Sequence, residues 1–424
     1  MQHIQGEERN QLKIYCLEQM IAPDSFVRAI DFFVDAIDLA SFGFKNITLK
    51  EEGRPPYHPS VLLKLYFYGY RYGIRSSRKL EREAGLNLEV RWLLCEQVPS
   101  ARTICSFRKD YAEAFRAIFR KFVFMLKELG LIEGKTIAID SFKVRAQNSL
   151  KNNYNQKKID RQLEYIDGRI NEFEDALDKA DSGEEKTKLT QKIETQKTRR
   201  EKYQSIESEL KETGKDQIST TDQDAQSVVL QRGITVVGYN VQGAVDSKHK
   251  LITHFDTGGV NDTNALADVA IAVKQVLKVE EMDVLADKGY KSAYKFQRYN
   301  TKKCKSCELQ PQCTKSKTNG RNIDRSEFAD DVIQNNRRVK ENSAYYKQRQ
   351  QLAEHPWGTL KRQRGFDHVL TRGKKNVLGE VSLVFIGYNL SRFMQITEGI
   401  NTFKELIKGI IARFIINRVY LKAI

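Results

Sequence analysis

Three acidic residues of this 424-residue chain have the surroundings expected of metal ligands. Asp140 follows the apolar run Ile137-Ala138-Ile139, and Asp287 follows Asp283-Val284-Leu285-Ala286. Because ligands gather outside the carboxyl ends of strands in open α/β sheets, both carboxylates are expected at strand ends. Glu354 lies in a later stretch and is the best candidate for a third ligand, from a helix. Each of the three taken alone is equally compatible with a turn or surface residue.

Together these carboxylates would suit phosphodiester chemistry. Two Mg²⁺ or Mn²⁺ ions about 3.5–4 Å apart can hold the attacking and leaving oxygens of an in-line displacement. Mg²⁺ uses few carboxylates and keeps water and substrate phosphate as its other ligands. Lys361 is seven residues after Glu354, two helical turns, so a phosphate-binding cation is expected on the same face. Pro356 places Glu354 at a helix start or a kink.

Other acids compete as ligands. Asp246 and Asp256 are the serious rivals, because each stands at an expected strand end. The remaining competitors are Asp222, Asp224 and Asp262.

The composition indicates a folded protein that binds a polyanion. Lys and Arg number 71 against 55 Asp and Glu, a net charge of +16, and 10% of the residues are aromatic. A basic protein without a nucleic-acid role is the alternative. The start of the chain does not resemble a secretory signal, and no run of about 18 apolar residues predicts a membrane span. We therefore expect a cytoplasmic protein.

Residues 1–130 are predicted to form an all-α domain for DNA binding or dimerisation. A capped helix over 76–84, ended by Gly85 and followed by a helix over 88–96, has the layout of a helix-turn-helix. A plain helical scaffold explains the same layout. The spacing also predicts one long helix over 103–129. The basic residues expected to be exposed on the first helix pair are Arg75, Arg78, Lys79 and Arg82, of which we assign Arg78 and Arg82 to DNA.

A heptad pattern fills the next segment, 151–215. Apolar residues recur at spacings of three and four on either side of the turn signal Asp181-Ser182-Gly183, which predicts an inserted antiparallel coiled-coil hairpin. A second protomer, DNA or a spacer role each fits this hairpin. The apolar positions are Ile159, Leu163, Ile166, Ile170, Phe173 and Leu177, then Leu189, Ile193, Tyr203, Ile206 and Leu210.

Residues 131–150 and 216–400 are predicted to form an α/β catalytic domain. Strands are expected over 137–140, 234–239, 240–245, 251–255 and 283–287, with a helix over 264–277. An apolar helical stripe from Leu383 to Phe393 should pack on the sheet, with Arg392 as a phosphate contact. Residues 401–424 are expected to form a basic amphipathic helix.

Three cysteines are bunched in a Lys-rich loop. Cys304, Cys307 and Cys313 have the spacing Cys-x2-Cys-x5-Cys, which suits a structural zinc ion or an iron–sulfur cluster. No fourth ligand lies nearby in sequence, so free thiols on a basic, DNA-facing loop are the alternative.

The motifs together resemble a DDE transposase of a bacterial insertion sequence, from the branch with an N-terminal helical domain. The resemblance covers nearly the whole chain. It is carried by Tyr57-His58-Pro59, Thr103-Ile104-Cys105-Ser106-Phe107-Arg108, Ile139-Asp140-Ser141, Gly238-Tyr239-Asn240-Val241-Gln242, Ala286-Asp287-Lys288-Gly289-Tyr290, Glu354-His355-Pro356-Trp357-Gly358 and Tyr388-Asn389-Leu390-Ser391-Arg392.

The resemblance implies an RNase H-like mixed sheet with flanking helices, in which Asp140, Asp287 and Glu354 are the catalytic triad and bind Mg²⁺ or Mn²⁺. It also implies a signature of Tyr, Arg, Glu and Lys, which Tyr346, Arg349, Glu354 and Lys361 match with one extra residue between Arg and Glu. The further residues assigned to nucleic acid are Arg362, Lys288 and Trp357, the last as a base-stacking residue or, alternatively, a core residue.

The activity implied is cleavage at the ends of the element followed by strand transfer into target DNA. The implied partners are the inverted repeats of the element, target DNA and a second protomer, near the bacterial nucleoid and without a membrane. A silent DNA-binding regulator and a purely hydrolytic nuclease are the alternatives.

Overall fold

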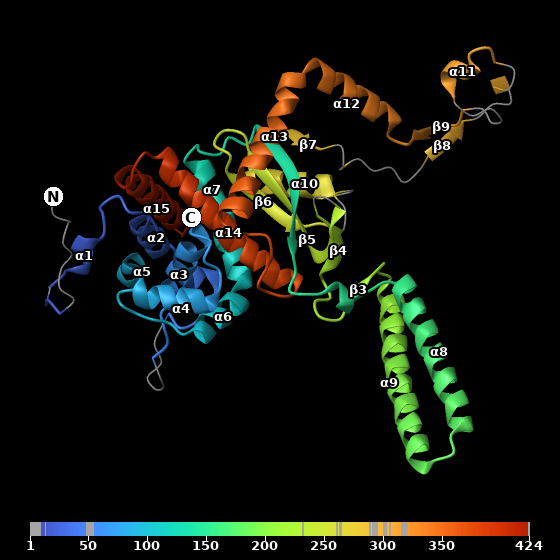
Figure 1. Cartoon of the computed structure of the whole chain (residues 1–424). Coiled ribbons are helices and arrows are strands. Elements are labelled where there is room, and N and C mark those ends of the chain that lie inside the picture. The colour runs from blue at the N-terminus through green and yellow to red at the C-terminus, as the bar shows by residue number, and fades with distance from the viewer. Residues whose placement is uncertain are drawn as a thin grey trace, which may run out of the picture.

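The computed structural model describes residues 10–12, 14–47, 55–230, 233–259, 262, 265–287, 290, 296–299, 303–304, 307–314 and 321–422. Within this part of the chain, N-terminal helices and a mixed sheet form one body, from which two long segments extend (Figure 1). A mixed α/β protein was predicted from the sequence, and this coarse assignment is confirmed. No helix of the described residues is long and apolar enough to cross a membrane.

The first part of the chain is helical, as predicted. Val27, Ile30 and Val34 are buried at helical spacing, and His58 precedes a helix with Pro59 in its first turn, where proline is tolerated. The elements are α1 (Leu17–Met20), α2 (Phe26–Asp35), the 3₁₀ turn η1 (Leu39–Phe42), α3 (Pro59–Arg71), α4 (Ser77–Leu86), α5 (Leu88–Leu93), α6 (Ala101–Asp110) and α7 (Ala112–Glu128).

Two expectations for these helices are wrong. The single helix over 103–129 is divided at Tyr111, whose ring lies 4.8 Å from the rings of both Phe44 and Phe107. Arg75 is not exposed but 7% accessible, because Glu380 and carbonyl oxygens surround it. Arg78 and Arg82 are exposed on α4, as expected.

The central sheet is built around one long strand. β5 (Thr235–Asp246) pairs antiparallel with β1 (Thr136–Arg145) on one side, and with β4 (Gln226–Val229) and β6 (Ile252–Thr257) on the other. β7 (Asp283–Ala286) pairs parallel with β1 at the edge. Strands over 234–239 and 240–245 were predicted separately, but continuous pairing with β1 joins them.

Helices hold this sheet against the N-terminal part. α14 (Lys374–Ile396) is buried along most of its length and contacts α3, α7 and β6. Its Asn389 is fully buried and forms hydrogen bonds with both the N–H (2.9 Å) and the carbonyl (2.8 Å) of Ile252. The other helices around the sheet are α10 (Ala265–Leu277), α13 (Ser343–Gly358) with a π-helical turn η6 (Thr359–Gln363), and α15 (Ile400–Lys422).

The segment predicted as a hairpin forms two antiparallel helices, α8 (Gln156–Lys179) and α9 (Gly183–Thr213), which project from the body (Figure 1). Ser182 caps α9 by accepting a hydrogen bond from the Glu185 N–H. At the base, Tyr154, Ile159 and Ile206 belong to a small separate core. The base also contains η2 (Leu150–Asn152), β2 (Asn153–Tyr154) and β3 (Ile218–Ser219).

A second segment extends from the body between β7 and α13 (Figure 1). The sequence prediction placed it within the catalytic domain, but its described elements lie beyond the sheet. These elements are β8 (Phe296–Tyr299), α11 (Gln310–Cys313), β9 (Ile323–Ser326) and α12 (Ala329–Glu341).

We predict that Asn389→Ala lowers the free energy of unfolding strongly. It leaves the buried N–H and carbonyl of Ile252 without a partner, at about 1–3 kcal/mol for each group. Lys375→Ala, on the exposed first turn of the same helix, should change stability by about 1 kcal/mol or less. Chemical denaturation of both variants measures this, and equal losses would contradict the role of Asn389 in joining α14 to β6.

Candidate active site

The parallel register of β1 and β7 brings two of the predicted acids together. Ile139 is level with Ala286, so Asp140 and Asp287 follow side by side on strands about 4.8 Å apart. The prediction that Asp140 ends its strand is wrong. β1 continues to Arg145 because β5 pairs with it throughout. Asp140 is half-buried, and the neighbouring strand β7 stops at Ala286.

α13 packs on the face of the sheet to which Asp140 belongs. Asp140 and Gly243 are paired in the β1–β5 ladder and therefore share a face. The Trp357 ring lies against Gly243, where a Cβ atom would overlap it, and its centroid is 4.8 Å from that of Phe142. At the other end of α13, Tyr346 donates a hydrogen bond of 3.1 Å to the Ala286 carbonyl.

Trp357 therefore belongs to the core. It is 7% exposed, and its ring is enclosed by Gly243, Phe142 and Phe385. The expectation that Trp357 stacks on a DNA base is wrong, because Gly243 leaves a space in the sheet that the indole ring fills.

Two cations of the predicted signature lie near the aspartates. Arg349 Nη2 is 4.0 Å from Asp287 Oδ1. Lys361 Nζ lies 5.5 Å from the Phe142 ring centroid, and the charge of Asp140 acts on it. Despite the extra residue in the signature, the side chains of Tyr346 and Arg349 both lie at the end of β7.

The helix geometry differs from the prediction in two ways. Of the two predicted positions for Glu354, a helix start is wrong, because α13 begins at Ser343 and includes both Glu354 and Pro356, and the helix continues into the wider turn η6. Because a π-helical turn advances fewer degrees per residue than an α-helix, Lys361 is rotated away from its expected alignment with Glu354. Arg362 is exposed on this turn.

Glu354 is exposed and accepts a hydrogen bond of 2.8 Å from Gln350 on its own helix. Within the described part of the chain, no three Asp, Glu, His or Cys side chains are grouped as metal ligands. The structure thus places Asp140 beside Asp287 without adding Glu354 to them.

The charges around Asp140 favour a bound cation. Burial, followed by the neighbouring charges of Asp262 and Asp287, raises the pKa of Asp140, while the Ser141 N–H and Arg349 act in the opposite direction. Burial also lowers the pKa of Lys361. Carboxylate oxygens that repel one another in a partly dry site are suitable ligands for Mg²⁺, so the donor set of Asp140 and Asp287 fits the implied metal.

Asp262, which the sequence analysis ranked among the lesser competitors, contacts two buried side chains of the sheet. Its Oδ1 accepts hydrogen bonds of 2.8 Å from both Asn240 and Gln242, which are buried on β5. Tyr290 donates to the other end of the Gln242 amide and is 6% exposed. The signal available in the sequence was the pair of amides two residues apart on one strand, since two buried amides require a polar partner.

The acids preferred as rivals have structural roles instead. Asp246 is fully buried and accepts hydrogen bonds from the N–H groups of Gly134 and Lys248. Asp256 pairs with Arg116 and Lys374 at 3.7 and 3.5 Å.

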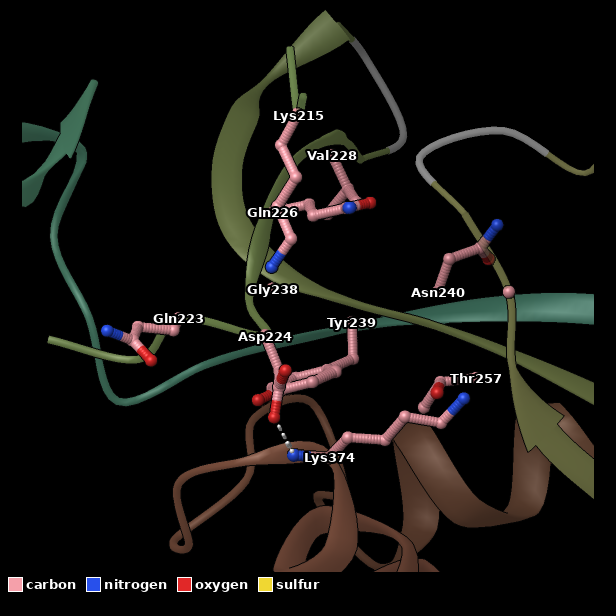
Figure 2. A pocket seen from close by; sticks show the side chains of 11 residues that line it. Lys215, Gln223, Asp224, Gln226, Val228, Gly238, Tyr239, Asn240, Thr257 and Lys374 are labelled. Atoms are coloured by element: carbon pink, nitrogen blue, oxygen red, sulfur yellow. Dashed lines mark hydrogen bonds between the residues drawn. The ribbon is translucent and has the colours of Figure 1, made fainter. Parts of the chain in front are cut away.

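Asp222 and Asp224 cap the start of α14. Asp222 accepts a hydrogen bond from the Gly373 N–H, and Asp224 accepts one of 2.7 Å from the Lys374 N–H. Figure 2 shows the latter contact at the edge of a cavity of about 200 Å³ between β4, β5 and α14.

Of the remaining predicted site residues, the described ones form no group with Asp140. Lys288 lies outside the described residues. Cys304 is half-buried, and Cys307 and Cys313 are exposed. In the described part of their loop these cysteines form no ligand group, and residues 305–306 and 315–320 between and after them lie outside that part. Arg392 donates to the His249 carbonyl.

We predict that Asp140→Asn raises the melting temperature at neutral pH in buffer without divalent ions. A carboxyl whose pKa is higher in the folded state binds its proton more tightly when folded, so ionised Asp140 reduces stability as the pH rises from the ordinary Asp range through the raised pKa. The gain should disappear below that range. Thermal unfolding from about pH 3.5 to 7.5 tests this, with exposed Asp175→Asn as control; identical curves for wild type and Asp140→Asn would contradict it.

Two family models match the chain. Residues 15–110 match a Transposase domain (DUF772), which spans α1 to α6. Residues 277–394 match a Transposase DDE domain, which includes Asp287, Glu354 and Lys361. Searches of curated proteins and of solved structures gave no match. The two matched regions have the order expected from the sequence motifs, and the chain belongs to the DDE transposases.

Proposed function

We propose that this chain is a metal-dependent enzyme that cleaves DNA at the ends of an insertion sequence and transfers the freed strand to target DNA. The observation that carries the proposal is the register of β1 and β7, which makes Asp140 and Asp287 neighbours. Arg349 lies beside this pair, and Lys361 is close enough for its charge to interact with Asp140. Acidic groups among cations suit a phosphodiester held through a metal.

The reaction proceeds by two displacements at phosphorus. In the first, a water oxygen bonds to the phosphorus at the element end, the P–O3′ bond breaks, and the leaving oxygen takes a proton to become a 3′-hydroxyl. In the second, that hydroxyl loses its proton and attacks a phosphodiester of the target, whose own 3′-oxygen leaves. No oxidant or nucleotide cofactor is required.

The residues divide this work by charge. Asp140 and Asp287 would hold Mg²⁺ or Mn²⁺, which supplies Lewis-acid stabilisation of the attacking and leaving oxygens. Lys361 binds a nonbridging phosphate oxygen, and its lowered pKa reflects a partly buried position where such a contact is strong. Arg349 orients Asp287 and neutralises phosphate. Glu354 completes the ligand set by leaving its hydrogen bond to Gln350.

The sheet supports the proposal at the level of architecture. Three antiparallel strands, β6, β5 and β1, are followed by β7 parallel to β1. This arrangement and the position of α13 on one face suit an RNase H-like domain.

DNA is the substrate implied by the transposase domains. We assign contacts with the inverted repeats to α4, whose Arg78 and Arg82 are exposed, and contacts near the scissile phosphate to Arg362. The active form is a homodimer, so that both element ends are processed together.

One observation favours a second function, a DNA-binding regulator without turnover. Glu354 is bonded within its own helix, and within the described residues no three-ligand group exists. A cleavage assay separates this regulator from the enzyme, and detection of joined products separates strand transfer from simple hydrolysis.

We predict that Asp140→Asn and Asp287→Asn each reduce cleavage of an end-labelled duplex carrying the element terminus by about 10²-fold or more. Even groups that only support metal ligands contribute about 10- to 100-fold. Duplex binding by gel shift should persist in both variants.

The matched control is Asp283→Asn on the same strand, where the side chain bonds Tyr345 and not the site. It should retain cleavage. Full cleavage by Asp287→Asn would transfer the ligand role to Asp262, whereas a wild type that binds DNA with Mg²⁺ and Mn²⁺ without cutting paired ends would favour the regulator.

A further inference from the structure

The helical hairpin α8–α9 has an incomplete apolar seam. α8 carries apolar residues at heptad spacing along its length, but α9 has none over 194–202. In this central stretch the contact between the helices is polar, with an ion pair of 2.7 Å between Arg200 and Asp167. The two ends differ: Ile159 and Ile206 are buried at the base, and Leu189 near the turn.

A groove of about 490 Å³ lies where the seam is interrupted. Its lining residues on α8 are spaced i, i+3 and i+4, and those on α9 are spaced i, i+3, i+4 and i+7, so each helix contributes one continuous face. Ile170 is the apolar residue among them and is 9% exposed. The lining is completed by Asp167, Asn171, Lys197, Arg200, Glu201 and Gln204.

The charge of the hairpin does not suit DNA. Residues 156–213 contain 13 Lys and Arg against 15 Asp and Glu, a net charge of −2. Since the whole chain has a net charge of +16, the remaining residues have a net charge of +18. Residues 172–185, at the end remote from the body, carry seven acids and one base. Because phosphate binding requires an excess of Lys and Arg, this arm would weaken contact with DNA.

The groove itself is electrically self-complementary. Asp167 and Glu201 balance Lys197 and Arg200, which gives no net charge. Because Arg200 and Asp167 already pair within the hairpin, Lys197 and Glu201 are the charges offered to a partner. A surface that carries equal numbers of both signs can meet a copy of itself across a two-fold axis, with each cation facing an anion. A polyanion would meet two of these four charges unfavourably.

We infer that the α8–α9 hairpin is a dimerisation arm, whose central groove binds the same groove of a second copy of this chain and forms a four-helix arrangement. The dimensions suit this partner. A hairpin about 36 Å long and two helix diameters wide offers roughly 700 Å², near the ~800 Å² that each partner buries in a stable interface. The pairing is independent of catalysis, although its use in joining two DNA ends rests on the proposed function.

The test is the dimer dissociation constant of the full-length chain without DNA, measured by sedimentation. Lys197→Glu places like charges in the groove and should weaken dimerisation at least about 10-fold. The double variant Lys197→Glu/Glu201→Lys restores the balance and should recover most of the affinity. Lys202→Glu makes the same charge change on an exposed part of α9 outside the groove and should have little effect.

Circular dichroism of each variant verifies that the helices are intact. A chain that remains monomeric at tens of micromolar would overturn the inference, as would equal weakening by Lys197→Glu and Lys202→Glu. Loss of DNA affinity with unchanged dimerisation would identify DNA as the occupant instead. Asp287→Asn should dimerise normally, so failure of the proposed chemistry and failure of the arm give different results.

Discussion

The buried carboxylate of Glu380 is the interaction on which the relation between the two halves of the body depends. It is inaccessible to solvent within α14 and accepts hydrogen bonds from the Leu370 N–H and from the N–H and hydroxyl of Thr371. Its other oxygen lies 3.5 Å from Arg75. Removing one partner of such a buried pair leaves a charge without compensation, at about 3–5 kcal/mol.

This pair connects the helix proposed to bind DNA to the proposed active site. Arg75 stands two residues before α4 and donates to the carbonyls of Gly365 and His368, just beyond the turn that carries Lys361. Arg108 donates to the Arg75 carbonyl and fixes it from α6. α4, which we propose binds DNA, and Lys361, which we propose binds phosphate, are thereby attached to one buried network, so under this proposal the fold sets the distance between the bound DNA and the sheet.

The sequence predicted what depends on local pattern and failed where distant segments decide. Apolar runs located β1 and β7, and their parallel pairing made neighbours of Asp140 and Asp287. No local signal could show that β1 continues beyond Asp140, because that extension is due to pairing with β5, about 100 residues later. The sequence around Trp357 left two interpretations open for the same reason, because the space that its ring occupies is provided by Gly243, which is distant in the sequence. Arg75 was expected to be exposed, and this expectation failed because its partner Glu380 is 305 residues away in the sequence.

The position of the hairpin in the chain explains how an arm could be added without disturbing the site. It is inserted between β1 and the strands that pair beside it, and its base closes through the two-residue pairing of β2 with β3. The small core around Ile159 and Ile206 stabilises the arm separately from the main core. Charge is separated in the same way: the body carries the positive excess that DNA requires, and the arm has a slight negative excess. Because an arm that attracted DNA would compete with α4 for the element end, this separation fits the proposal that one chain binds DNA and a second copy at the same time.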